Sequence, residues 1–302
     1  MTIGGNISWF IISLLLVGCS PGGDSVTVYT SQDQVYAEPI LQLFERETGI
    51  RVRAVYDSEV VKTVGLVNRL IAEKSHPRCD LFWNNEAFRT HQLVAREVLA
   101  ADEPIESFGM RTRQWIWNTN QLGRAELPPG LFALTNAQWR GRMVIALPLF
   151  GSTATHFQVL RQRWGEARWE AWCRALLAND VMMVDGNSVV VQLVGRGEVA
   201  LGLTDSDDVQ AGLRNGLPIA GKSLGPDGLV IRNTLGHVRG APHPALARRL
   251  AKFLKSLPVR SALVEAGAIE AGVTPSANEV AWPSLVEANE RAVGELQSIF
   301  LD

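Results

Sequence analysis

Oxygen-bearing side chains gather immediately after three apolar runs of the chain. The runs at 26–29, 80–83 and 199–203 are typical of buried strands. The residues that follow the three runs, in chain order, are Ser31, Gln32 and Asp33, then Asn85 and Glu86, then Asp205, Asp207 and Asp208. Carboxylates are preferred ligands of hard cations, so these sets favour cation binding.

A fourth polar set follows the apolar run 143–147 and opens a predicted helix with Ser152, Thr153 and Ala154. Free amides at a helix start favour an anion. The alternative is that Ser152 and Asp205 merely cap helices and that Asp33 and Glu86 are solvated, which explains each residue taken singly about as well as binding does. The clustering of the sets at strand ends is what favours a ligand site.

Predicted strands alternate with amphipathic helices along most of the chain. Further strands are expected at 51–56, 114–118 and 228–231. The helix before residue 51 should hold Pro39 in its first turn and end at Gly49. This alternation predicts an α/β fold with mostly parallel sheets flanked by helices, in which ligands bind beyond the carboxyl ends of the strands.

The strand–helix pattern restarts near residue 113, which predicts two lobes joined by two chain crossings, with a hinge and an interlobe cleft. We expect the first lobe to contain residues 26–112 and 226–277. The second lobe should contain residues 113–225 and 278–302.

Composition excludes several classes of protein. The 302 residues carry a formal net charge of −2, and the lysines and arginines are scattered, so nucleic-acid binding has no electrostatic support. Besides Cys19, the chain has Cys79 and Cys173, which fall in different predicted lobes and form no Cys-x-x-Cys pair. We therefore expect a monomeric globular protein without a disulfide framework.

The N-terminus has the features of an export signal. An uncharged apolar run at 7–17 is followed by Gly18 and Cys19, so residues 1–18 read as a signal peptide. Residues 16–19 are similar to the bacterial lipobox, which implies acylation of Cys19, with residues 19–25 as a tether. The expected location is the periplasm or the cell surface, anchored to the membrane by lipid. An ordinary cleaved signal peptide with an incidental cysteine is the alternative.

Two catalytic motifs match by letters alone. Residues 216–223 (GLPIAGKS) have the spacing of a phosphate-binding loop, and residues 221–225 match the Gly-x-Ser-x-Gly pattern around Ser223. Both motifs require a strand before the loop and a helix after it. Here 218–220 reads as a strand, and Pro226 begins a turn where the helix should start. We expect no enzyme activity, and a hydrolase that uses Ser223 is the rival interpretation.

Taken in order, five segments resemble the ferric-iron class of periplasmic solute-binding proteins, which have the two-lobed type II fold. The segments are 28–32, 44–49, 80–86, 197–202 and 240–244. The resemblance implies a binding protein of an ABC importer, with the permease and its ATPase as partners, no catalytic cofactor, and an iron-like cation as bound ligand. A small anionic organic solute such as a phosphonate, or a sensory role without transport, is the alternative.

Carried over by position, the family's metal ligands become Asp33, Glu86 or its neighbour Asn85, and Asp207 with Asp208. The accompanying anion of these relatives would sit at Ser152, Thr153 and Ala154. The family's adjacent tyrosine pair is absent.

The chain's tyrosines are Tyr29, Tyr36 and Tyr56, all in the first predicted lobe. Carboxylates in place of phenolates would still favour a hard cation, with less selectivity for ferric iron.

Overall fold

A computed structural model describes residues 24–57, 64–272 and 280–301. The predicted signal peptide at 1–18, the lipobox at 16–19 and most of the tether at 19–25 lie outside the described residues. Within the described ranges, no helix combines the length and the apolar character that crossing a bilayer requires.

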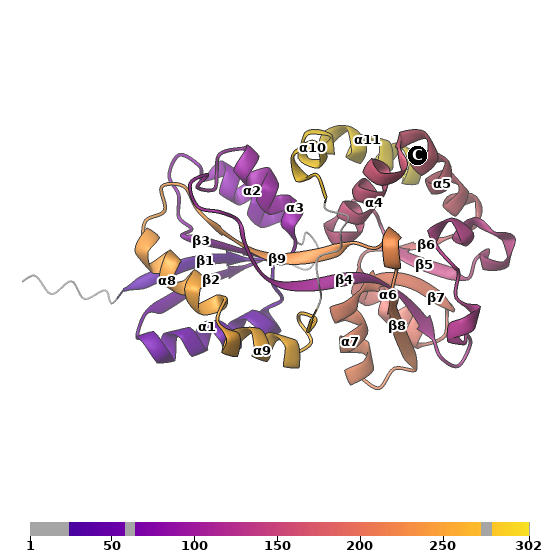
Figure 1. Ribbon diagram of the computed structural model, residues 1–302, viewed down its shortest axis with the longest axis horizontal. Coiled ribbons are helices and arrows are strands. Elements are labelled where there is room, and N and C mark those ends of the chain that lie inside the picture. The colour runs from indigo at the N-terminus through magenta and orange to yellow at the C-terminus, as the bar shows by residue number, and fades with distance from the viewer. Residues whose placement is uncertain (1–23, 58–63, 273–279, 302) are drawn as a thin grey trace, which may run out of the picture.

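The first lobe is built on three parallel strands. Its leading elements are β1 (Ser25–Thr30), α1 (Gln34–Thr48), β2 (Arg51–Tyr56), α2 (Val64–Ala72), β3 (Leu81–Asn84) and α3 (Ala87–Ala95). β1 pairs in parallel with both β2 and β3. β9 (Val230–His237), α8 (Pro244–Leu254) and α9 (Leu257–Glu265) return to this lobe late in the chain (Figure 1). Separate apolar clusters under α1 and α8 and under α2 and α3 show that both faces of the sheet are covered.

The second lobe repeats the plan. Its elements are β5 (Met143–Ala146), α4 (Gly151–Trp164), α5 (Glu166–Ala178), β6 (Met182–Val184), α6 (Asn187–Gly195), β7 (Leu201–Asp205), α7 (Ser206–Arg214) and β8 (Ile219–Ser223). β5 pairs in parallel with β6 and β7. Short 3-10 turns η2 (Arg124–Glu126), η3 (Leu131–Thr135), η4 (Ala137–Trp139) and η5 (Gly225–Asp227) complete it.

One long strand, β4 (Glu106–Asn118), belongs to both lobes. Up to Thr112 it pairs antiparallel with β9, and from Arg113 onward it pairs antiparallel with β7, with β8 joining from Gln114. The described strands therefore form one continuous path, β2-β1-β3-β9-β4-β7-β5-β6, with β8 on β4. The parallel core of each lobe is thus extended by antiparallel strands, because β4 and β9 run back and forth across the molecule.

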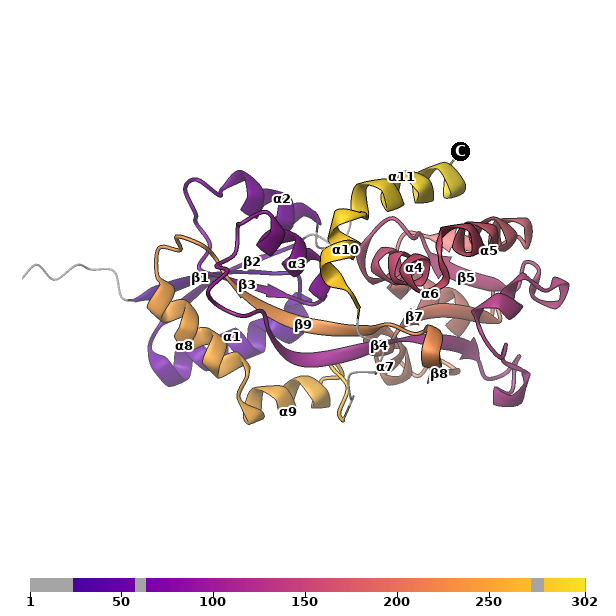
Figure 2. The ribbon, with the colours of Figure 1, turned by 45° about the horizontal axis from the view of Figure 1, so that its top comes forward.

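The C-terminal helices α10 (Trp282–Glu287) and α11 (Asn289–Phe300) together pack against both lobes. α10 lies between α3 and α4, and α11 packs on α4 and α5 (Figure 2). Leu285 of α10 shares an apolar cluster with Phe88 of α3 and Val159 of α4. Trp282 stacks on His91, with ring centroids 5.1 Å apart. These contacts fasten the two lobes together near β9.

Several local predictions are confirmed. Gly49 ends α1 in the left-handed region at φ 71°, and residues Ile219–Ser223 form β8, followed by a 3-10 turn, so no phosphate-binding loop exists there. Cys79 and Cys173 are buried free cysteines.

The placement of Pro39 in the first turn was wrong. α1 begins at Gln34, with Asp33 as its N-cap, so Pro39 lies in its second turn. The side chain of Val35, whose carbonyl the proline cannot pair, is 72% exposed, so water has access to this stretch.

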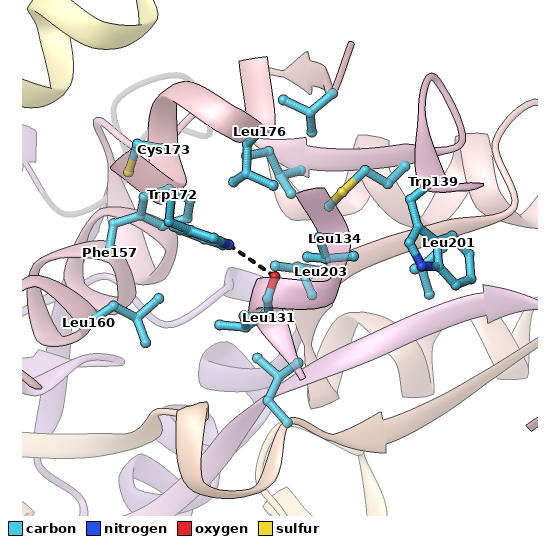
Figure 3. Packing of buried hydrophobic residues seen from close by; sticks show 14 of the residues in the cluster. Leu131, Leu134, Trp139, Phe157, Leu160, Trp172, Cys173, Leu176, Leu201 and Leu203 are labelled. Carbon is cyan, nitrogen blue, oxygen red and sulfur yellow. Dashed lines mark hydrogen bonds between the residues drawn. The ribbon is translucent and has the colours of Figure 1, made fainter. Parts of the chain in front are cut away.

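The core of the second lobe is rich in tryptophan (Figure 3). Trp172 is buried, its ring centroid lies 5.3 Å from that of Phe157, and its indole Nε1 donates a hydrogen bond of 2.9 Å to the carbonyl oxygen of Leu131. Trp169 is equally buried, but its indole N–H has no hydrogen-bond partner in the described protein. Of the two indole N–H groups, only that of Trp172 has a hydrogen-bond partner among the described residues.

We predict that Trp172→Phe destabilises the protein by about 1 kcal/mol more than Trp169→Phe, because only the former removes a buried hydrogen bond. Trp172→Ala should cost about 3–5 kcal/mol through the cavity it creates. Urea denaturation of the three variants measures these differences. Equal destabilisation by the two phenylalanine variants would show that the hydrogen bond contributes nothing.

Candidate functional site

The carboxyl ends of β1, β3, β5, β6 and β7 open onto one cleft between the lobes, with a cavity volume of about 140 Å³. Among the described residues, every parallel strand except β2 contributes to it. The lining residues are Asp33, Asn85, Glu86, Arg111, Ala146, Leu147, residues 150–153, residues 185–188, Asp205, Asp207 and Asp208.

Most of the residues singled out in the sequence meet in this cleft. The eight that line it are Asp33, Asn85, Glu86, Ser152, Thr153, Asp205, Asp207 and Asp208. Ser31, Gln32 and Ala154 are buried and are not among the lining residues. Ser31 accepts a hydrogen bond from the backbone N–H of Asn85 at 3.0 Å, and Gln32 accepts one from Asn233 Nδ2 at 3.0 Å. These two residues hold the loops that carry the lining residues.

Sequence reasoning missed Arg111, Phe150 and the segment 185–188. The segment follows β6, a strand of three residues, and has the same polar composition as the other strand ends. An apolar run at 181–184 before Asp185 was the available signal. Arg111 gave no comparable signal, because it precedes the predicted strand at 114–118 and a lone arginine is expected to face solvent.

Glu86 has both carboxylate oxygens occupied. As the N-cap of α3, its Oε1 accepts the backbone N–H of Arg89 at 2.9 Å. Its Oε2 accepts the hydroxyl of Thr155 in α4 at 2.7 Å, which links the two lobes across the cleft. Burial raises the pKa of Glu86 above its ordinary value.

Asp205 is the centre of a buried polar network in the second lobe. Its Oδ1 lies 2.7 Å from Arg113 Nη1, and its Oδ2 accepts the Ser152 hydroxyl at 2.6 Å. Asn187 accepts a second bond from Arg113, at 3.1 Å, and donates to Ser152 at 3.2 Å. Burial opposes ionisation of Asp205, but the guanidinium groups of Arg113 and Arg111 hold its pKa below the ordinary value.

Asp207 has one oxygen in use and one without a partner. Its Oδ2 lies 2.6 Å from Arg111 Nη1, whereas its Oδ1 is buried and has no hydrogen-bond partner among the described residues. The residue is 8% exposed. Burial raises the pKa of Asp207, Arg111 opposes this shift and the nearby Asp205 adds to it. Oδ1 is therefore an acceptor that the protein itself does not satisfy.

The cleft as a whole is acidic. Among the described lining residues one guanidinium, that of Arg111, faces the carboxylates of Asp33, Glu86, Asp185, Asp205, Asp207 and Asp208. Carboxylate oxygens of Asp205, Asp207 and Asp208 lie within 4.8 Å of one another. This charge balance attracts a cation and repels an anion.

The α4 N-terminus is a weaker anion site than the sequence suggested. The Ser152 hydroxyl has one proton, and it donates that proton to Asp205. An anion would therefore be held by the backbone amides at the start of α4, close to the Asp205 carboxylate.

Two α/β lobes that share a cleft at their strand ends define the class of two-lobed periplasmic binding proteins. The chain belongs to the bacterial extracellular solute-binding protein family, whose model matches residues 26–268. The type II fold that the resemblance implied is confirmed.

Curated relatives of the chain are iron-binding proteins by name. The major ferric iron-binding protein of Neisseria meningitidis is 22% identical over 219 residues, which is 67% of this chain and 64% of the relative. The Fe(3+)-binding periplasmic protein of Serratia marcescens is 26% identical over 196 residues, covering 59% and 56% of the two chains. The chain thus spans less than two thirds of these relatives' length.

Among solved structures, iron-bound HitA from Pseudomonas aeruginosa superimposes with a TM-score of 0.80. It shares 20% sequence identity, and the match covers 92% of this chain and 99% of HitA. At this identity the likeness supports the fold.

His156 lies in α4 behind the cleft and is fully buried. Its Nε2 is 2.7 Å from the carbonyl oxygen of Asp227, to which the neutral imidazole donates. Burial, with Arg113 nearby, lowers the pKa of His156 to about 3. Below about pH 6.5 the unfolded chain binds a proton at this residue and the folded chain does not, so acid destabilises the fold.

We predict that His156→Gln flattens the pH dependence of the unfolding free energy by up to about 1.4 kcal/mol per pH unit between about pH 6 and pH 4. Urea denaturation at a series of pH values measures the slope. His76→Gln, at an exposed position, is the matched control. Identical slopes for wild type and His156→Gln would contradict the assignment of a neutral buried imidazole.

Proposed function

We propose that this protein is the solute-binding component of an ABC importer and that it binds a small, iron-like hard cation in the interlobe cleft. The observation that carries the proposal is the acidic lining, which includes Asp207, whose buried Oδ1 has no hydrogen-bond partner among the described residues. Carboxylate oxygens are the donors that hard cations prefer. The names of the Neisseria and Serratia relatives support the same ligand class.

The proposed ligands are Asp207 through Oδ1, together with Asp33 and Asp208, which line the same cleft. Glu86 belongs to the predicted set, but its two occupied oxygens give it mainly the task of linking α3 to α4. The Tyr29 hydroxyl is not a ligand in this arrangement, because it donates to Glu73 Oε2 at 2.9 Å. A cation held by carboxylates alone should be bound with less selectivity for ferric iron.

Delivery would depend on hinge closure about β4 and β9, the two strands that cross between the lobes. The proposed first lobe contains residues 26–112 and 226–277. The proposed second lobe contains residues 113–225 and 278–302. The cleft is bridged on one side by Glu86 and Thr155. Arg214 of α7 bridges it on the other, donating to the Tyr36 hydroxyl at 3.0 Å. In this arrangement the lobes meet on both sides, and the permease with its ATPase would recognise the closed monomer.

Cation binding can be tested with gallium(III), a redox-inert stand-in for ferric iron, in nitrilotriacetate-buffered calorimetric titrations. We predict that wild-type protein binds and that Asp207→Asn weakens binding by about tenfold or more, since one anionic ligand is lost and Arg111 is left unneutralised. Asp180→Asn is the matched control, because Asp180 is 63% exposed and paired with Arg140 away from the cleft. Tight binding of a phosphonate without any metal would overturn the cation proposal.

We further propose that the mature protein is lipid-anchored through Cys19 outside the cytoplasm. Expression in a bacterium fed with labelled palmitate should give a labelled wild-type protein and an unlabelled Cys19→Ser variant. Cys79→Ser, at a buried position, should stay labelled. Equal labelling of all three proteins, or of none, would leave the lipobox match incidental.

A further inference from the structure

Arg111 lies at the point where β4 leaves one lobe for the other. It is paired with Ile231 of β9, two residues before the strand turns to β7. The side chain is 5% exposed and lines the cleft. Its Nη2 donates to the carbonyl oxygen of Asn85 in the first lobe at 2.8 Å, and its Nη1 meets Asp207 of the second lobe at 2.6 Å. Arg111 thus contacts both sides of the cleft.

The Arg111 guanidinium is a permanent positive charge beside the carboxylates of the cleft. It lies 3.8 Å from Asp205 as well as 2.6 Å from Asp207, and arginine does not lose its proton in proteins. Arg111 and Arg113 together offset two of the three charges of the Asp205, Asp207 and Asp208 cluster. A cation bound through Asp207 Oδ1 would share one carboxylate with Arg111 and be repelled by it.

We propose that Arg111 is a specificity-determining residue that weakens cation binding in proportion to the charge of the cation. The inference rests on the proposed function and deepens it. Coulomb repulsion between a fixed positive charge and a ligand is linear in the ligand's charge. Arg111 therefore opposes a trivalent ion about one and a half times as strongly, in free energy, as a divalent ion. Arg111 therefore reduces the preference for trivalent over divalent ions that the carboxylates create.

The test is calorimetric titration of Arg111→Gln and wild type with gallium(III) and manganese(II) in nitrilotriacetate buffer. We expect affinity to rise for both ions, by about tenfold for the divalent ion and about thirtyfold for the trivalent one, because the logarithms of the two gains should stand in the ratio of the charges. Arg111→Lys keeps the charge and should show much less of this gain. Arg163→Gln removes the same charge behind α4, outside the cleft lining, and should change affinity less than about twofold.

Equal gains for the two ions, or weaker binding of either, would overturn the inference while leaving the proposed function intact. Failure of wild type to bind either cation would instead overturn the proposed function, and the inference with it. Arg111→Gln leaves Asp207 buried without its counter-charge and could unfold the protein. The double variant Arg111→Gln/Asp207→Asn has no uncompensated carboxylate at this position. Its affinities, compared with those of Asp207→Asn alone, should show the same charge-proportional gain.

Discussion

The charge of the cleft depends on two arginines that lie two residues apart on β4. Arg113 lies directly opposite Asp205 in the register of β4 and β7, and their side chains form a buried ion pair. Arg111 points to the same face and meets Asp207 in the first turn of α7. Because burying unpaired carboxylates would cost several kcal/mol each, these pairs are what allow so many acidic groups to gather at the strand ends.

These two ion pairs lie where β4 passes from the first lobe into the second. The same residues therefore set the charge of the cleft and join the two lobes. Arg111 reaches the Asn85 carbonyl on one side and Asp207 on the other. Closer to β9, Phe88, Val159 and Leu285 join α3, α4 and α10 in one apolar cluster. The contact between the lobes therefore combines a charged part inside the cleft with an apolar part near β9.

The architecture and most of the cleft could be predicted because they follow from local patterns. Apolar runs mark the strands, and polar residues after a run identify the edge at which parallel strands end. Asp33, Asn85 and Asp207 were found in this way. Arg111 and Arg113 could not be, since their burial depends on β4 pairing with strands that come about a hundred residues later, which no local pattern reveals. The alternative of a solvated Glu86 is wrong, because this residue is 3% exposed and caps α3, and its bond to Thr155 depends on how the lobes meet.

The strand order has a consequence for how the chain acquires its shape. β9 lies between β3 and β4 in the sheet, although it is made after all the strands of the second lobe. Until β9 arrives, β3 and β4 each keep an open edge, and the apolar residues of α8 and α9 that cover this sheet are missing as well. The sheet of the first lobe therefore cannot be completed until β9 has been synthesised. Insertion of the late strand β9 between the early strands β3 and β4 completes the sheet.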